Sequence, residues 1–426
     1  PYSTGVTNNG AQSGYVTFNV PWDAPAHLYY QCQAHGNMVG NIYIRGGAGG
    51  NTNVGVITAT AFVPTTGQLS HRNIIINGAC MVAQRGTSSS SVGYQTVDRF
   101  KLGAGGADEV PQQYQGTLGS HESPYNEGHR YTYYIVNGDQ SNGAGAGDYA
   151  EIQYKVEARD MATCGWNYTS ASSYITLSFW VKSSVGQNFY GFVFSADGTS
   201  QRYIFQTGNI TANSWNKIVV TIPGGSNVAF DADNGEGFII KWIPFYGTDK
   251  TNNSATVGSW ANYNGAARCP DNTTTWWTTN NSTFFITGIQ LEVGQQATPF
   301  EHRSYGEELE RCRRYYQVIL DRSTDSGDDS GLGGTVYQSS AGAVYVPIRF
   351  CPPMRTKPTV ESSNNGNEFR TRHGDLVNFD NFTGFNTVSR HGGTLIASAS
   401  GNKTVGHYYW IETDQGSAKL AVSAEL

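Results

Sequence analysis

The sequence predicts an all-β protein made chiefly of antiparallel sandwiches. Charged residues form only 14% of its 426 residues, whereas glycine occurs 52 times and tyrosine 26 times. Many short segments alternate apolar and polar residues and are separated by glycine, asparagine and aspartate. Alternation with a period of two is typical of half-buried strands, and the scarcity of charge disfavours amphipathic helices. A chain of this length is long enough for two or three domains.

Residues 73–303 carry the clearest strand pattern. In SYITLSFWVKSS (173–184), apolar residues occupy every second position from Ile175 to Val181, which places them on one face of a strand. The same alternation recurs in WNKIVVTIPG (215–224), GFIIKWIPFYG (237–247) and FFITGIQLEVG (284–294). Many short strands separated by turn residues predict one antiparallel jelly-roll sandwich over residues 73–303.

The flanking segments predict a modular chain. Residues 1–46 alternate like a small β unit, and residues 47–72 form a glycine-rich linker and connector of low charge. Residues 320–426 return to short strands with few apolar residues for their length. Such a C-terminal β-domain is expected to complete its core with partner subunits.

Residues 304–319, SYGEELERCRRYYQVI, form the one segment with clear helical features. Ser304 and Glu307 make a capping box, and acidic residues precede basic ones, as the helix dipole favours. Apolar residues at the spacing of a coiled-coil seam are Leu309, Cys312, Tyr316 and Ile319. The segment predicts either a helix docked on its neighbouring domain or a neck that gathers identical chains about an axis. Since two turns are too few to associate alone, the sequence leaves both interpretations open.

Charge and cysteine usage limit the classes of partner. The net charge of −6 is spread along the chain without a basic block, so we expect no nucleic-acid partner. No apolar run is long enough to span a membrane, and no signal peptide is present. Six widely separated cysteines predict free thiols, which suits folding in a reducing cytoplasm. A chain that starts at Pro1 is expected to belong to a longer polypeptide.

A possible copper site lies near the start of the chain. Cys32, His35 and Met38 follow the spacing C-x2-H-x2-M and supply the soft ligands of a blue-copper centre. Such a centre needs a second histidine, and His27 lies too close in sequence to supply it. We therefore expect a buried structural cysteine and no cofactor.

Two segments are candidates for sugar binding. A polar loop at 259–285 contains four aromatic residues that could stack on sugar rings: Trp260, Tyr263, Trp276 and Trp277. The alternative is that one or two of these indoles cap the sandwich core. Basic residues that could pair with anionic sugars or phosphates lie at 361–393: Arg370, Arg372 and His373. Four nearby phenylalanines, Phe369, Phe379, Phe382 and Phe385, would either lie at an exposed recognition surface or form a subunit interface.

No catalytic motif appears in the sequence. The glycine-rich stretch GAGAGD (143–148) lacks a lysine and a βαβ context, so it predicts a loop. DADNGEG (231–237) has calcium-loop spacing but lacks the closing glutamate, so it predicts a turn. We expect a protein that is not an enzyme, although carboxylates from distant loops could still converge.

Four stretches resemble bacteriophage tail-fibre and receptor-binding proteins, particularly those of marine phages: residues 73–100, 176–224, 286–316 and 346–360. The second resembles a carbohydrate-binding-module-like jelly roll, and the third resembles a closing strand and helix that recur in phage fibres. Residues 24–44 are similar to the C-terminal end of a cupredoxin-like module. The resemblance implies that 1–46 is the last part of such a module and that 320–426 is the fibre tip.

The resemblance also implies a function. It predicts a non-catalytic homotrimer in the virion, assembled in the host cytoplasm and exposed outside the cell. Other virion tail proteins and a host surface glycan would be its partners, and many weak glycan contacts would together give firm attachment. The alternatives are a free bacterial lectin-like adhesin and a glycan-degrading enzyme.

Overall fold

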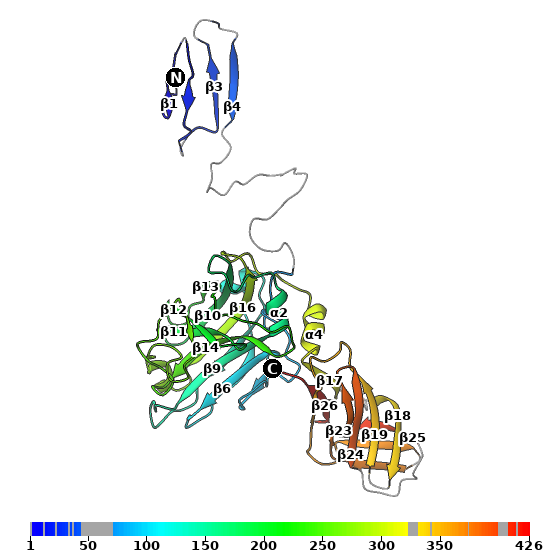
Figure 1. The fold of residues 1–426 in the computed structure, drawn as a ribbon. Coiled ribbons are helices and arrows are strands. Elements are labelled where there is room, and N and C mark those ends of the chain that lie inside the picture. Colours follow the sequence, from blue (N-terminus) through cyan, green and yellow to red (C-terminus); the bar gives the residue numbers. More distant parts are fainter. Residues whose placement is uncertain are drawn as a thin grey trace. The chain divides into compact units, whose positions relative to one another are not determined.

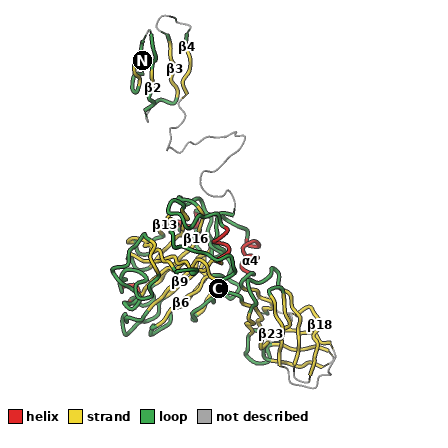
Figure 2. Tube along the Cα trace, viewed as in Figure 1, coloured by secondary structure: helices red, strands yellow, loops and turns green. Residues whose placement is uncertain are grey.

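The computed structural model describes residues 2–11, 13–21, 24–32, 35, 38–43, 71–322, 331–340, 343–373, 375–398, 408–414 and 416–426. The chain divides into two compact units, Pro1–Val63 and Pro64–Leu426. Figures 1 and 2 show both units as β structures. Except for its last two residues, the predicted connector 47–72 lies outside the described residues.

The N-terminal unit consists of two small antiparallel sheets (Figure 1). Strand β1 (Val6–Thr7) pairs with β2 (Thr17–Phe18), and β3 (His27–Gln31) pairs with β4 (Val39–Tyr43). Several large side chains of this unit are exposed, with Tyr29 at 71% and Tyr43 at 64%. The predicted β unit is therefore present, and its described residues form a thin structure with little core.

The central part of the second unit is a sandwich of two six-stranded antiparallel sheets. The first sheet has the order β13 (Asn216–Pro223), β10 (Tyr174–Ser183), β16 (Thr283–Val293), β8 (Tyr131–Val136), β7 (Gln112–Thr117) and β5 (Ser88–Ser89). The second sheet has the order β15 (Trp260–Asn262), β12 (Gln201–Asn209), β11 (Asn188–Ser195), β14 (Glu236–Tyr246), β9 (Tyr149–Glu157) and β6 (Phe100–Gly105). This confirms the predicted all-β jelly-roll fold.

The inner faces of the two sheets form the main core. The alternation predicted for β10 is confirmed, because Ile175, Leu177, Phe179 and Val181 are all fully buried. Phe179 packs edge-on against Trp242 of β14, with ring centroids 5.7 Å apart. Each such side chain contributes about 1.5–3 kcal/mol by leaving water. Short helices α1 (Ser123–Asn126), α2 (Ala158–Thr163) and α3 (Thr275–Thr278) lie in the connections.

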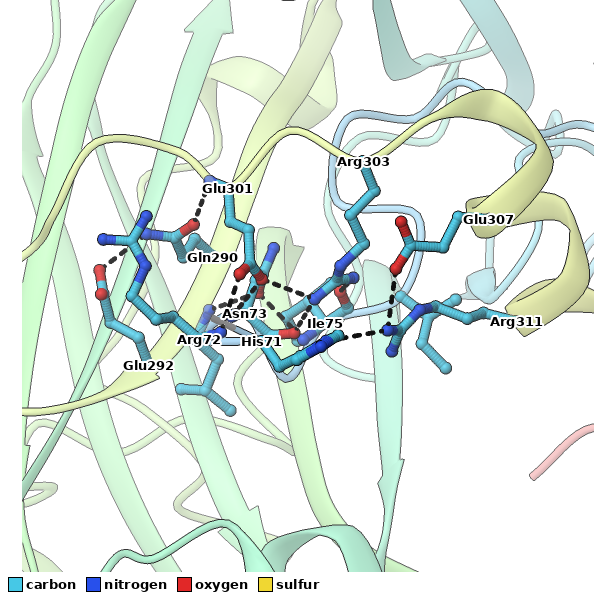
Figure 3. Close-up of polar contacts among 12 residues, drawn as sticks. His71, Arg72, Asn73, Ile75, Gln290, Glu292, Glu301, Arg303, Glu307 and Arg311 are labelled. Atoms are coloured by element: carbon cyan, nitrogen blue, oxygen red, sulfur yellow. Dashed lines mark hydrogen bonds and ion pairs between the residues drawn. The ribbon is translucent and has the colours of Figure 1, made fainter. Parts of the chain in front are cut away.

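A polar network fastens the first residues of the sandwich to its last strand and to the following helix (Figure 3). The Asn73 side chain accepts from the backbone N–H of Leu291 at 3.0 Å and donates to the carbonyl of Ile289 at 3.1 Å. Glu301 accepts from the backbone N–H of Asn73 and pairs with Arg303, each at 3.0 Å. The network holds residues 73 and 291, far apart in sequence, side by side.

Helix α4 (Tyr305–Arg313) begins as predicted but is shorter than the predicted 304–319. The Ser304 side chain accepts from the backbone N–H of Glu307 at 3.2 Å, which confirms the N-cap. The helix ends at Arg313 because the next residues form β17 (Tyr316–Asp321), which pairs with β26 (Lys419–Ser423). Among the described residues, no helix is long and apolar enough to cross a bilayer.

The predicted trimer neck required its four apolar residues to lie along one helix, and this prediction is wrong. Leu309 and Cys312 lie on α4, whereas Tyr316 and Ile319 lie on β17. Cys312 is fully buried within its own chain, and Tyr316 is 2% exposed. Pairing with a strand some hundred residues later overrode the local helical pattern. The four side chains consequently form no continuous helical stripe.

The C-terminal strands form two antiparallel sheets. The smaller has the order β17, β26 and β20 (Thr359–Ser362). The larger has the order β22 (Asp375–Phe379), β21 (Phe369–His373), β25 (Tyr408–Thr413), β18 (Gly331–Ser340), β19 (Ala343–Arg349), β24 (Gly392–Ser398) and β23 (Phe382–Ser389). Phe369, Phe379 and Phe382 are 0–3% exposed and pack together at centroid distances of 5.2–5.6 Å. The expectation that these three rings contact the host or a partner subunit is wrong, because strand pairing points them toward the core of their own domain.

The end of the chain docks on the sandwich through buried charges. Glu425 pairs with Arg99 at 2.5 Å and with Arg85 at 3.3 Å. Arg314, directly after α4, makes a bidentate pair with Glu157 at 2.7 Å on both oxygens. These contacts support the docked-helix interpretation of the α4 segment.

Candidate functional site

Two of the predicted sugar-stacking residues belong to the core. Trp276 and Trp277 of α3 are fully buried. Their indole N–H groups donate to the carbonyls of Thr283 and Gly143, each at 3.1 Å, and Trp277 stacks on Phe245. Their prediction as binding residues is wrong, and the core-capping alternative describes them correctly. A paired indole pattern cannot distinguish these two outcomes by itself.

The other two predicted aromatics are half-buried but point to different sides of the second sheet. Trp260 packs against Tyr203 of the main core, and its indole donates to the carbonyl of Pro223 at 2.6 Å. Tyr263 packs against Phe194 on the outer side, with ring centroids 4.8 Å apart. The structure therefore does not bring Trp260 and Tyr263 together into one stacking platform.

The predicted basic site in the C-terminal part is already neutralised where it is described. Arg370 pairs with Glu412 at 3.0 Å and with Asp414 at 2.7 Å. These two carboxylates compensate its charge, so its prediction as an anion-binding residue is wrong. The side chains of Arg372 and His373 lie outside the described residues.

Sequence reasoning missed one exposed indole in the same part of the chain. Trp410 of β25 is 69% exposed, and its backbone pairs with that of Arg372. The alternation in HYYWIE could have located it, since Ile411 is fully buried and its neighbours along the strand point to the opposite face.

The predicted copper ligands do not form a blue-copper set. The Cys32 sulfur lies 3.5 Å from Nδ1 of His35, but Met38 is 58% exposed. His27 instead contacts Asn41 at 3.0 Å and stacks on Tyr43. No group of three or more histidine, cysteine, aspartate or glutamate side chains that could hold a metal ion occurs among the described residues. Cys32 itself is only half-buried, so the expected buried structural cysteine is also wrong.

The predicted turn at 231–237 is present. Asp233 accepts from the backbone N–H of Gly235 at 2.7 Å, and the N–H of Asp231 donates to Asp197 at 3.0 Å. Aspartate side chains commonly organise turns through such local hydrogen bonds. The stretch therefore serves as a connection between strands.

The outer face of the first sheet carries a row of side chains that crosses the strands at one register. Lys182 of β10 lies opposite Phe285 of β16, which lies opposite Tyr134 of β8. Tyr134 in turn lies opposite Tyr114 of β7. At the other end Trp215 directly precedes β13, and Nζ of Lys182 lies 4.8 Å from its ring centroid. All five side chains, which we call the cross-strand row, are half-buried.

The rings of this row stack on one another. Tyr114 and Tyr134 are 4.9 Å apart with an interplanar angle of 13°, and Tyr134 and Phe285 are 4.6 Å apart at 20°. Lys182 covers the other face of the stack, with Nζ 4.5 Å from the Phe285 centroid. Because ring faces contact one another, the row presents ring edges and phenol groups outward. Four steps between neighbouring strands make it about 19 Å long.

Two clusters of tryptophan, glutamate and lysine hold one side of this face. Glu122 accepts from Nζ of Lys182 at 2.6 Å and from the indole N–H of Trp215 at 2.7 Å. Two residues further along the strands, Glu127 accepts from Lys217 at 2.8 Å and from the indole of Trp180 at 3.2 Å. Glu122 and Glu127 flank α1 on either side. The α1 segment therefore fixes both indoles on the sheet.

Both carboxylates of these clusters are ionised. Burial raises the pKa of Glu122, but hydrogen bonds from Lys182 and Trp215 outweigh it, and the pKa lies below its ordinary value. The pKa of Glu127 is lowered in the same way, with Lys217 and Trp180 outweighing its burial. Each negative charge is balanced by a lysine. These two ion pairs add no net charge, and the face combines aromatic rings with polar groups, which suits a long ligand rich in hydroxyl groups.

Comparisons with known proteins show structural likeness only. No family model matches the chain, and no curated protein matches it. Among solved structures, the enzymatically active domain of bacteriophage CBA120 tailspike protein 4 has 12% identity over 52% of this chain, with a TM-score of 0.28. This chain covers 21% of that structure, or about a fifth of its length.

Carbohydrate-binding modules are also similar. A family 11 module from Clostridium thermocellum in complex with a mixed-linked tetrasaccharide has 12% identity, with 50% of this chain and 98% of that chain covered and a TM-score of 0.23. A family 61 module in complex with β-1,4-galactotriose has 11% identity, 52% and 99% coverage and a TM-score of 0.25. At these scores the likeness decides neither ligand nor activity.

Proposed function

We propose that this chain is a non-catalytic glycan-binding protein of the bacteriophage tail-fibre kind, which attaches the virion to the host cell surface. The main support for this proposal is the cross-strand row on the outer face of the first sheet. Aromatic edges, phenol groups and compensated ion pairs on a rigid sheet provide apolar and hydrogen-bonding contacts for a saccharide chain. The resemblance of residues 286–316 to fibre sequences motivates the virion context.

The absence of catalysis is part of the proposal. Glycoside hydrolysis needs one carboxylic acid that stays protonated beside a second carboxylate. Hydrogen bonds lower the pKa of both Glu122 and Glu127, so this pair lacks the required acid. A ligand on this face would therefore be bound without being cleaved.

Self-association as a homotrimer and contact with other virion tail proteins also belong to the proposal. Its basis is the sequence resemblance, since α4 provides no continuous seam. Light scattering of the full chain on a sizing column tests this part. A stable trimer would support the fibre, whereas a monomer would favour the lectin-like adhesin.

The glycan proposal is tested with labelled full-length protein on a glycan array, followed by calorimetry with the best oligosaccharide. Trp215→Ala and Tyr134→Ala should each weaken binding about tenfold or more, as aromatic truncations at binding centres do. Tyr190→Ala, a half-buried tyrosine on β11 of the second sheet, is the matched control and should bind normally. Equal affinity in all variants would refute the row as the binding site.

A further inference from the structure

The outer face of the second sheet contains a buried arginine. Arg202 of β12 lies opposite Phe194 of β11 on one side and Ala261 of β15 on the other. Its successor Tyr203 faces the main core, so the side chain of Arg202 points to the outer face. The residue is only 5% exposed.

No acidic side chain among the described residues forms an ion pair with the guanidinium of Arg202. Its Nε and Nη1 atoms are buried and have no hydrogen-bond acceptor in the described part of the protein. The groups that act on it electrostatically are the side chains of Cys269 and Tyr263. Burial raises the pKa of both of these groups, to about 12 for Cys269, so neither supplies a negative charge near neutral pH. A buried charge without a partner is strongly unfavourable.

Two other buried arginines of this chain have carboxylate partners. Arg99 pairs with Glu425 at 2.5 Å, and Arg303 pairs with Glu308 at 2.8 Å. The sandwich therefore supplies carboxylates wherever it buries these guanidinium groups for structural reasons. Arg202 departs from this pattern, since no carboxylate of the described residues pairs with it, and an anionic ligand would supply the missing counter-charge.

The surroundings of Arg202 suit a small ligand group at the edge of the sheet. Tyr263 and Cys269 belong to the segment that follows β15, and residues 264–266 between them are exposed. Arg268 of this segment donates to the carbonyl of Gly265 at 3.1 Å. A ligand that reaches the guanidinium would have to pass this exposed segment.

We propose that Arg202 anchors a second binding site, which takes an oxyanion group, a carboxylate or a sulfate, carried by an acidic sugar. Arginine binds both groups through charge-assisted hydrogen bonds. The choice of a sugar as carrier rests on the proposed function, whereas anion binding does not. The site lies on a different sheet from the cross-strand row, so the two sites are independent.

The test uses the full chain and follows thermal unfolding at constant ionic strength with sodium glucuronate, acetate or sulfate. Glucose and sodium chloride are the controls. We expect a saturable rise of the unfolding temperature with glucuronate, as for any ligand that binds only the folded state. If acetate raises the unfolding temperature as much as glucuronate does, the sugar part of the proposal is refuted. If only sulfate raises it, the site takes a sulfate group and not a carboxylate.

Matched variants assign the effect to Arg202. Arg202→Met should abolish the rise, whereas Arg159→Met, which removes an exposed arginine bonded to the carbonyl of Ala232, should retain it. Without any anion, Arg202→Met should be at least as stable as the parent protein. A rise that persists in Arg202→Met would overturn the site, and so would a failure of that variant to fold. Neutral-glycan binding at the cross-strand row should be unchanged in both variants, so failure of one proposal is distinguishable from failure of the other.

Discussion

The outer faces of the two sheets differ in whether their basic side chains are paired with carboxylates. On the first sheet, Lys182 and Lys217 each pair with a glutamate that also holds an indole. On the second sheet, Glu151 compensates Lys241 at 2.6 Å, whereas Arg202 pairs with no carboxylate of the described residues. On the first face both lysines are therefore paired, whereas on the second face a lysine is paired and a buried arginine is not. In our two proposals, the first face binds an uncharged glycan and the second face binds an anion.

The largest expected effect comes from removing a carboxylate that compensates a buried arginine. Glu425→Leu leaves Arg99, which is 1% exposed, without its carboxylate. Loss of one partner of a buried ion pair costs about 3–5 kcal/mol. Chemical denaturation followed by tryptophan fluorescence should show this loss, whereas Arg202→Met should show none. Similar losses in both variants would mean that Arg202 already has a partner.

Tryptophan truncations should separate stability from binding. Trp277→Ala removes a fully buried ring and should lower the free energy of unfolding by about 3–5 kcal/mol. Trp215→Ala removes a half-buried ring and should lower the free energy of unfolding by about 1 kcal/mol, while weakening binding at the cross-strand row about tenfold or more. Denaturation and calorimetry on the same preparations measure both quantities. Normal glycan binding by Trp215→Ala would show that the tryptophan–glutamate–lysine clusters are not part of the ligand site.

Acidification should affect the first face through its two glutamates. Because the pKa values of Glu122 and Glu127 are lower in the folded protein than in the unfolded chain, their ion pairs stabilise the fold above about pH 4.3. This contribution is lost as the pH falls through the folded pKa, and exposure limits it to below about 1 kcal/mol each. Unfolding midpoints between pH 6 and 3 should be less pH-dependent in Glu122→Gln. Glu310→Gln, an exposed position on α4, is the control and should keep the full dependence.

The smallest effect concerns the thiol below the second face. All six cysteines are free, as predicted. Cys351 is exposed, whereas Cys269 is fully buried and burial raises its pKa to about 12. Alkylation at pH 8, followed by mass spectrometry of peptides, should therefore label Cys351 first and Cys269 last. Faster labelling of Cys269 would show that the 264–266 segment opens readily, which would sharpen the route proposed to Arg202.

Sequence patterns predicted the secondary structure where local and tertiary preferences agree. The alternation from Ile175 to Val181 correctly predicted β10, and Ser304 correctly predicted the N-cap of α4. The same reasoning extended α4 too far, because Tyr316 and Ile319 are held by β26 from the far end of the chain. Local periodicity contains no information about such a distant partner.

Binding residues were predicted less well because residue type does not reveal exposure. Trp276 and Trp277 lie in a polar segment yet fill the core, and Arg370 is neutralised by Glu412. The cross-strand row was missed because its five members come from five separate segments: Trp215, Lys182, Phe285, Tyr134 and Tyr114. Only strand register brings them to one line.

The sequence by itself determined the all-β class, the alternating strands and the start of the single clear helix, since these depend on neighbours along the chain. Tertiary structure alone decided which aromatics are buried, which charges are compensated and which side chains share a face. Those properties depend on the order and register of strands from distant segments. The cross-strand row and the position of Arg202 on the outer face of the second sheet both result from that order.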